Sequence, residues 1–125
     1  MTQALKSALL MLILGLTPSV VMAQSQRDMN EAALADARRA DQALNAQYAA
    51  TRARLSPGSR TLLRDAQRSW ITFRDSHCRY EASSVEGGSV YPMIHAMCIT
   101  RLTDDRTLEL RRLGECVEGD LSCPS

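Results

Sequence analysis

Apolar residues recur every three or four positions along most of the chain, which is the spacing of one face of an α-helix. Three segments show this spacing, at about residues 28–55, 60–81 and 89–113. No segment alternates apolar and polar residues over a sustained length, so we predict no sheet. The pattern therefore predicts an all-α fold, and the short connections favour a small three-helix antiparallel bundle.

The first predicted helix, residues 28–55, is rich in Ala, Arg, Gln and Leu, which are good helix formers. We expect it to end at the turn Ser56-Pro57-Gly58. One face of this helix is interrupted by a carboxylate. The members of that face are Leu34, Ala37, Asp41, Leu44, Tyr48 and Leu55.

The second predicted helix, residues 60–81, carries the most regular amphipathic stripe of the chain. It contains the only Trp and the only Phe of the protein. Large aromatic side chains supply much of the burial energy of a small core, so we expect this stripe to be the core. The stripe comprises Leu63, Ala66, Trp70, Phe73, His77 and Tyr80.

A break in the pattern separates the second and third helices, with Gly87-Gly88 at its centre. Two successive glycines allow backbone angles that other residues avoid. We predict that Ser89 caps the third helix, that Pro92 lies in its first turn, and that Gly114 ends it.

The inner face of the third helix also contains a charge, Arg106. A buried charge needs a partner, so we predict that Arg106 pairs with a carboxylate, either Asp41 or Asp75. The whole predicted face is Ile99, Leu102, Arg106, Leu110 and Leu113.

The beginning of the chain has the order of a cleavable signal peptide. Lys6 precedes the apolar run Ala8–Leu16, and Val21-Met22-Ala23 forms the cleavage site. This run is shorter than the roughly 20 residues of a membrane-spanning helix. We therefore expect a signal peptide at 1–23, a helical domain at 24–113 and a tail at 114–125. The mature chain would be periplasmic or secreted, with no membrane span.

Loss of residues 1–23 would remove Lys6, the only charged residue of that segment, and leave 14 basic and 14 acidic residues in the mature chain. A balanced charge is not typical of a protein that binds nucleic acid or clamps onto an anionic membrane.

Four cysteines follow the predicted signal peptide: Cys78, Cys98, Cys116 and Cys123. An even number of cysteines in an exported chain predicts two disulfides, for which three connectivities are possible. We favour Cys78–Cys98 and Cys116–Cys123, because each closes a local loop. The first would contribute about 3 kcal/mol of stability, and the second would tie down the tail.

Candidate catalytic and metal sites are weak. His77 and His95 accompany Cys78 and Cys98 in a potential zinc set, but adjacent residues on a helix diverge by about 100°, and oxidation would remove the thiols. Ser89 follows two glycines, yet it lies outside the nucleophile motif of serine hydrolases. We predict no catalytic residues, no metal and no cofactor.

Three stretches of the chain together resemble a known family. They are the run L-R-D-A-Q-R-S-W-I-T-F-R-D-S-H-C at 63–78, the segment 86–110, and Met29-Asn30-Glu31. The chain resembles the LprI-type lysozyme inhibitor family of small exported bacterial domains. The positions that match the family pattern are Trp70, Phe73, Arg74, Asp75, Cys78, Gly87, Gly88, Cys98 and Arg106.

The resemblance implies a binding protein without catalysis, with lysozyme as its partner. We expect the loop between the second and third helices to bind, through Arg79, Glu86, Gly87, Gly88, Ser89 and Tyr91. We expect a structural core and ion pair formed by Tyr48, Trp70, Phe73, Arg74, Asp75, Arg106 and Asp41. The alternative is an envelope interaction module whose partner is another envelope protein.

Overall fold

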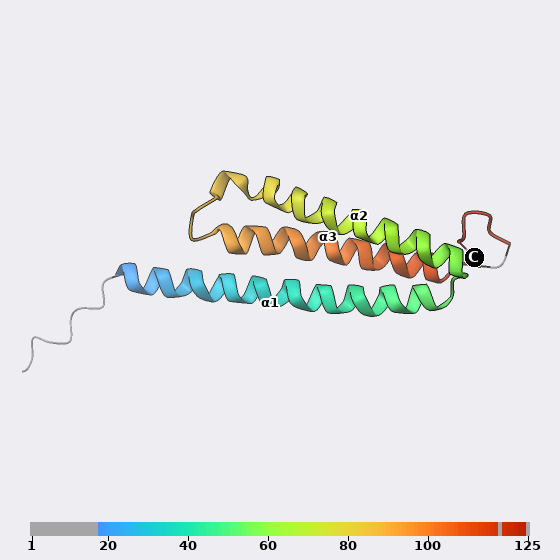
Figure 1. The fold of residues 1–125 in the computed structure, drawn as a ribbon. Coiled ribbons are helices and arrows are strands. Elements are labelled where there is room, and N and C mark those ends of the chain that lie inside the picture. Colours follow the sequence, from blue (N-terminus) through green and yellow to red (C-terminus); the bar gives the residue numbers. More distant parts are fainter. Residues whose placement is uncertain (1–17, 118, 125) are drawn as a thin grey trace, which may run out of the picture.

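A computed structural model describes residues 18–117 and 119–124, and the apolar run at 8–16 lies outside these residues. The described residues form three α-helices, a short 3₁₀ turn and no strand, which confirms the all-α prediction (Figure 1). The elements are α1 (Pro18–Ala53), α2 (Pro57–Glu81), η1 (Ser83–Val85) and α3 (Tyr91–Gly114).

Two helices begin earlier than the sequence predicted. α1 is already helical at Pro18, the first described residue, rather than beginning near Asp28. α2 starts at Pro57, where the Ser56 side chain accepts a hydrogen bond from the Ser59 N–H at 3.4 Å. The Ser-Pro pair therefore starts α2 as well as ending the connection from α1.

α1 and α3 run parallel, side by side along much of their length, and α2 runs in the opposite direction (Figure 1). α1 contributes small or short side chains to this contact, with Ala33, Ala40 and Thr51 all buried. The Thr51 hydroxyl donates to the Leu110 carbonyl at 2.8 Å. A Cβ at Gly114 would lie 2.9 Å from Thr51 Oγ1. The two helices therefore approach closely where small residues face each other.

The predicted inner face of α3 is largely confirmed. Ile99, Arg106 and Leu110 are buried, and Leu102 and Leu113 are half-buried. On the face predicted for the first helix, Leu44 of α1 and Leu55, just after α1 ends, are buried as predicted, but Leu34 is 41% exposed.

The prediction that the aromatic stripe of α2 forms the core is wrong. Phe73 is 55% exposed and Tyr80 is 78% exposed, whereas the buried residues of α2 are Gln67 and Cys78. α2 lies against α3 and diverges from α1 toward the end that carries η1 (Figure 1). Its inward face is therefore rotated away from the aromatic stripe, toward a row that contains polar side chains.

Arg74 is the centre of the contact between α2 and the other two helices. Its side chain is 12% exposed, and its guanidinium donates to Asp41 Oδ1 at 2.8 Å and to Thr103 Oγ1 at 3.2 Å. Asp75 lies 3.0 Å away and completes the ion pair. One arginine thus links residues from all three helices, and it takes both carboxylates that were predicted for Arg106.

Arg106 finds a carboxylate, but a different one. It donates to Glu109 on its own helix at 2.6 Å and to the Gln67 side chain at 3.0 Å. Trp70, half-buried, lies between the two arginines, with its ring centroid 5.3 Å from Arg74 Cζ and 6.0 Å from Arg106 Cζ. The predicted structural residues do cluster, but as a polar layer around Trp70 rather than as an aromatic core.

Both favoured disulfides are present, Cys78–Cys98 and Cys116–Cys123, each with a Cα–Cα distance of 5.5 Å. The first joins α2 to α3 and is buried, whereas the second closes the exposed tail. In the tail, hydrogen bonds from the hydroxyl and the N–H of Ser122 hold the pKa of Asp120 below its ordinary value.

Candidate functional site

The connection between α2 and α3 is a folded, protruding segment, which we call the tip (residues 83–90). Consecutive backbone hydrogen bonds shape it: Val85 N–H to Ala82 O at 3.1 Å, then Gly88 N–H to Val85 O at 3.0 Å. Gly87 has φ +77, a conformation that side chains disfavour. The tip therefore holds a fixed shape although most of its side chains are exposed.

The tip is anchored at both of its ends. Ala82, at its start, is 0% exposed, and the buried Cys78–Cys98 disulfide lies one turn before it. Among the described residues, Asn30 of α1 makes the further contact, because its Nδ2 donates to the Ser89 carbonyl at 2.9 Å. Gln26 donates to Asn30 Oδ1 at 2.9 Å and orients that amide.

Ser89 does not cap α3, contrary to the prediction. Val90 occupies the cap position and makes no side-chain capping bond. Ser89 lies one residue before the cap position, and its carbonyl accepts a hydrogen bond from Asn30. Its hydroxyl is consequently exposed on the tip, with no hydrogen-bond partner among the described residues.

The predicted binding residues do not all lie together. Glu86, Gly87, Gly88 and Ser89 lie together on the exposed tip. Tyr91 lies at its base, half-buried, with its ring stacked on His95 at a centroid distance of 5.6 Å.

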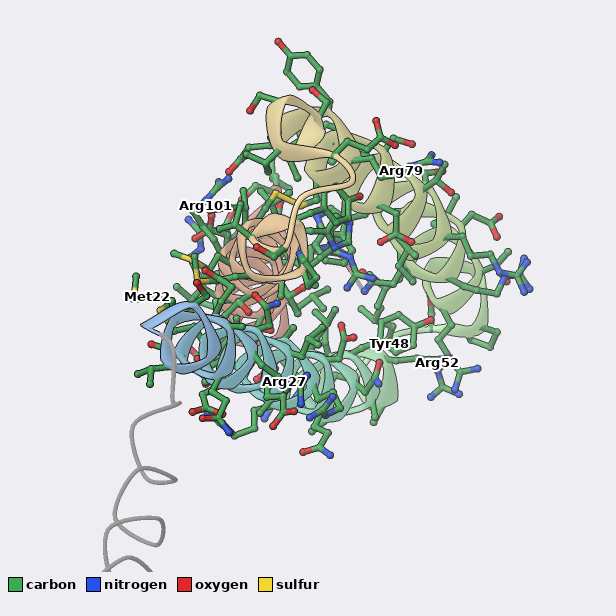
Figure 2. The ribbon with its side chains drawn as sticks, turned by 90° about the vertical axis from the view of Figure 1, so that its left-hand side faces the viewer. Met22, Arg27, Tyr48, Arg52, Arg79 and Arg101 are labelled. Carbon is green, nitrogen blue, oxygen red and sulfur yellow. A yellow bond between two sulfur atoms is a disulfide. The ribbon has the colours of Figure 1, made fainter. Side chains whose placement is uncertain are left out.

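Arg79 does not belong to the tip. It is exposed on the last turn of α2 and points away from α3 (Figure 2). No carboxylate pairs with it in the part of the chain that the structure describes.

The chemistry offered by the tip is hydrogen-bond donation. Within the described residues, the N–H groups of Gly87 and Ser89 make no hydrogen bond. With the Ser89 hydroxyl, they give a narrow surface that can donate to carboxylate or carbonyl oxygens. Glu86 is the only charged residue of the tip.

The zinc set considered from the sequence does not assemble. Cys78 and Cys98 are bonded to each other, so neither sulfur can bind a metal as a thiolate. His77 and Glu81 lie near Cys98, but the Glu81 carboxylate already pairs with Arg101 at 2.7 Å and with His77 at 3.3 Å.

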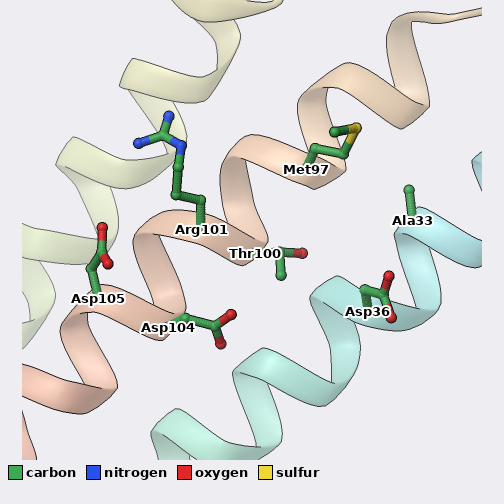
Figure 3. Close-up of a pocket in the computed structure, with 7 residues that line it drawn as sticks. All are labelled: Ala33, Asp36, Met97, Thr100, Arg101, Asp104 and Asp105. Atoms are coloured by element: carbon green, nitrogen blue, oxygen red, sulfur yellow. The ribbon is translucent and has the colours of Figure 1, made fainter.

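Hollows also lie away from the tip. A groove of about 440 Å³ runs between α1 and α3, where Asp104 projects toward α1 and Arg101 toward α2 (Figure 3). Asp36 and Asp105 also line it, and Asp104 and Asp105 are exposed.

The second hollow, of about 250 Å³, is apolar and lies where α1 ends and α2 begins. Its lining includes Leu55, Leu62 and Leu113. Over the described residues, no helix has the length and apolar character needed to span a membrane.

Asn30 supports the tip, although it is not among the site residues predicted from the sequence. The signal was present, because the run Met29-Asn30-Glu31 belongs to the family resemblance. Its contact with Ser89 joins residues 59 positions apart, which helix periodicity does not address.

Comparison with known proteins gives three matches. The model of the family described as lysozyme inhibitor LprI matches residues 19–110. An uncharacterised protein of Rhizobium meliloti (strain 1021) is 35% identical over 114 residues, which cover 81% of this chain and 82% of that protein. The crystal structure of a DUF1311 family protein from Pseudomonas putida KT2440 is similar in fold, with a TM-score of 0.66 and 23% identity, over 72% of this chain and 94% of that one.

Proposed function

The chain belongs to the lysozyme inhibitor LprI family, and from this membership we propose that it is an exported protein that binds and inhibits lysozyme without catalysing a reaction. The tip is the element that we assign to binding. The observation that carries this assignment is its support on both sides, by the disulfide and by Asn30.

An inhibitor that blocks an active-site cleft must enter the cleft with little loss of conformational freedom. Hydrogen bonds and a positive-φ glycine already fix the backbone of the tip. Glycosidase clefts hold a pair of carboxyl groups. The N–H groups of Gly87 and Ser89 and the Ser89 hydroxyl are suitable donors to such groups.

Glu86 limits how the tip can enter the cleft of lysozyme. A carboxylate that entered a cleft lined by carboxylates would be repelled. Glu86 therefore lies at the rim of the complex in this proposal, facing solvent or a basic side chain of lysozyme. Glu86→Gln should leave inhibition unchanged or slightly improve it.

Export is the second part of the proposal. Two disulfides are typical of an oxidising compartment. Cleavage after Ala23 would shorten α1 at a stretch where residues 21–25 are all exposed. The mature chain would begin at Gln24, and it would be periplasmic or secreted. Mass spectrometry of the envelope fraction should find Gln24 as the first residue.

Inhibition is tested by titrating the oxidised chain from Gln24 into lysozyme that is clearing a cell-wall suspension. We expect a dose-dependent loss of clearing. Ser89→Ala should weaken inhibition by roughly tenfold or more, because a hydrogen bond to a charged group contributes about 1.5–3 kcal/mol. Ser84→Ala, an exposed serine at the start of the tip, is the matched control and should inhibit like the parent.

Combining Ser89→Ala with Tyr91→Ala should abolish inhibition while circular dichroism still reports a folded helical chain. Equal inhibition by both serine variants would move the binding surface away from the tip. No inhibition by the parent chain at a large molar excess would reject lysozyme as the partner. The alternative, an envelope module that binds another protein, would then be the hypothesis to pursue.

A further inference from the structure

α2 carries an exposed row of side chains that none of the described elements covers. We call it the outer stripe; its members are Leu62, Ala66, Ser69, Phe73, Ser76 and Tyr80. All six are exposed, with Leu62 at 72%, Phe73 at 55% and Tyr80 at 78%. Three of the six are large, and small residues separate them along one helix face. Apolar groups exposed together on one face are typical of an interaction surface.

The spacing of the outer stripe identifies the shape of its partner. Its members follow one another at intervals of four and three residues, which is the heptad spacing of a coiled-coil seam. At 1.5 Å per residue, the stripe is about 27 Å long. A seam of this length and period is complementary to another helix.

The order of large and small residues in the stripe is self-complementary. A two-fold axis at the level of residue 71 would run a second α2 antiparallel to the first. It would bring Phe73 opposite Ser69, Ala66 opposite Ser76 and Leu62 opposite Tyr80 of the second copy. The Phe73–Ser69 layers would pair a large side chain with a small one. The Ala66–Ser76 layers would contain two small side chains, and the Leu62–Tyr80 layers two large ones. A parallel pairing would instead oppose Phe73 to itself and Ser69 to itself.

The charges beside the stripe agree with the same antiparallel arrangement. Asp65 and Arg79 flank opposite ends of the stripe on one side, and both are exposed. In the antiparallel pair, the position level with Asp65 is His77 of the other copy. Arg79 of that copy lies two residues further along, about 3 Å by helical rise, which is within reach of its long side chain. Arg79 has no carboxylate partner among the described residues, and Asp65 pairs only with its exposed neighbour Arg64. Such a pair contributes little by itself but favours this register over others.

We propose that a second copy of this chain binds the outer stripe, forming a two-fold symmetric dimer through antiparallel α2 helices. The buried positions of α2, Gln67 and Cys78, point in a different direction from the stripe. Dimerisation therefore leaves the bundle unchanged. The two tips lie at opposite ends of the dimer, so this proposal does not depend on what the tip binds.

The test is sedimentation equilibrium of the oxidised chain from Gln24 over a range of concentrations. The parent should show a monomer–dimer equilibrium, and Phe73→Glu should be monomeric throughout. Leu108→Glu is the matched control, because Leu108 is 53% exposed on α3, away from the stripe. It should dimerise like the parent.

A charge exchange fixes the register. Asp65→Arg alone and Arg79→Asp alone should each weaken dimerisation by about tenfold, since each places two like-charged pairs in the interface. Mixing the two variants should restore a dimer, because every facing pair is then of opposite charge. A parent that is monomeric at all concentrations overturns the proposal. A dimer that Phe73→Glu leaves intact, or a mixture no tighter than its components, also overturns it.

Discussion

Gly114→Ala tests whether the close approach of α1 and α3 sets the stability of the bundle. The new Cβ would lie 2.9 Å from Thr51 Oγ1, which is too close for a non-bonded contact. Thr51 is 2% exposed, and its hydroxyl donates to the Leu110 carbonyl at 2.8 Å, so it has little room to move. The substitution must displace that hydroxyl or separate the helices.

The expected change in the free energy of unfolding is the sum of opposing effects. Losing the Thr51 hydrogen bond costs about 1 kcal/mol, and overpacking costs about 1–3 kcal/mol. Replacing a helical glycine by alanine returns at most about 1 kcal/mol, less at a helix end. We expect a net loss of about 1–2 kcal/mol in the free energy of unfolding. For a domain of this size the melting temperature would fall by roughly 5–10 °C.

Gly58→Ala is the matched control, because a Cβ added at Gly58 would have no atom within 4 Å and the φ of Gly58 is not positive. It lies in the first turn of α2, so the same substitution should stabilise by about 0.5 kcal/mol. Thermal and urea unfolding followed by circular dichroism measure both. The cost of Gly114→Ala should shrink in a Thr51→Ala background, a coupling that a double-mutant cycle reports. If Gly114→Ala stabilised the chain as Gly58→Ala does, the close-approach argument would be refuted.

Three further outcomes are expected. Replacing Cys78 and Cys98 by serine should lower the free energy of unfolding by about 3 kcal/mol in urea titrations, since the bond closes a separation of 20 residues; an unchanged midpoint would contradict this. Arg74→Ala should lower the free energy of unfolding by about 2 kcal/mol. The substitution leaves the Asp41 carboxylate of α1 and the buried Thr103 hydroxyl of α3 without their donor. A loss below about 0.5 kcal/mol would show that the polar layer around Trp70 does not hold α2 in place. Asn30→Ala should speed amide hydrogen exchange around Ser89 with little change in melting temperature, and unaltered exchange would mean that Asn30 does not support the tip.

The helices and their connections were predictable because they depend on local residue order. Periodicity located three helices, and Ser56-Pro57 and Gly87-Gly88 located the turns between them. The two disulfides were also predictable, because each closes a short local loop. None of these features requires knowledge of which helix packs on which.

The inward face of α2 was not predictable from periodicity. The stripe containing Phe73 and Tyr80 is real, but the described chain contains nothing that covers it. The row that faces α3 contains Gln67 and Arg74, whose burial is possible only because residues of α1 and α3 supply hydrogen-bond partners. A periodicity search scores such a row as polar and assigns it to solvent.

The same limit explains the partner of Arg106 and the role of Ser89. A charged residue in an apolar face predicts a partner but does not identify it. Arg106 uses Glu109 one turn away, which its sequence spacing allowed. The carbonyl of Ser89 is used by Asn30 of α1, a contact that only the tertiary fold creates.

The buried disulfide between Cys78 and Cys98 determines what proteolytic cleavage of the tip would produce. The most accessible backbone between α2 and α3 is the tip, where an endopeptidase would cut first. A cut anywhere in residues 83–90 would leave two fragments that the disulfide still joins just below the break. The nicked chain would keep α1, α2 and α3 in one covalent unit. Cleavage could therefore end the activity of the tip without releasing a fragment, and it would be visible as two bands only after reduction.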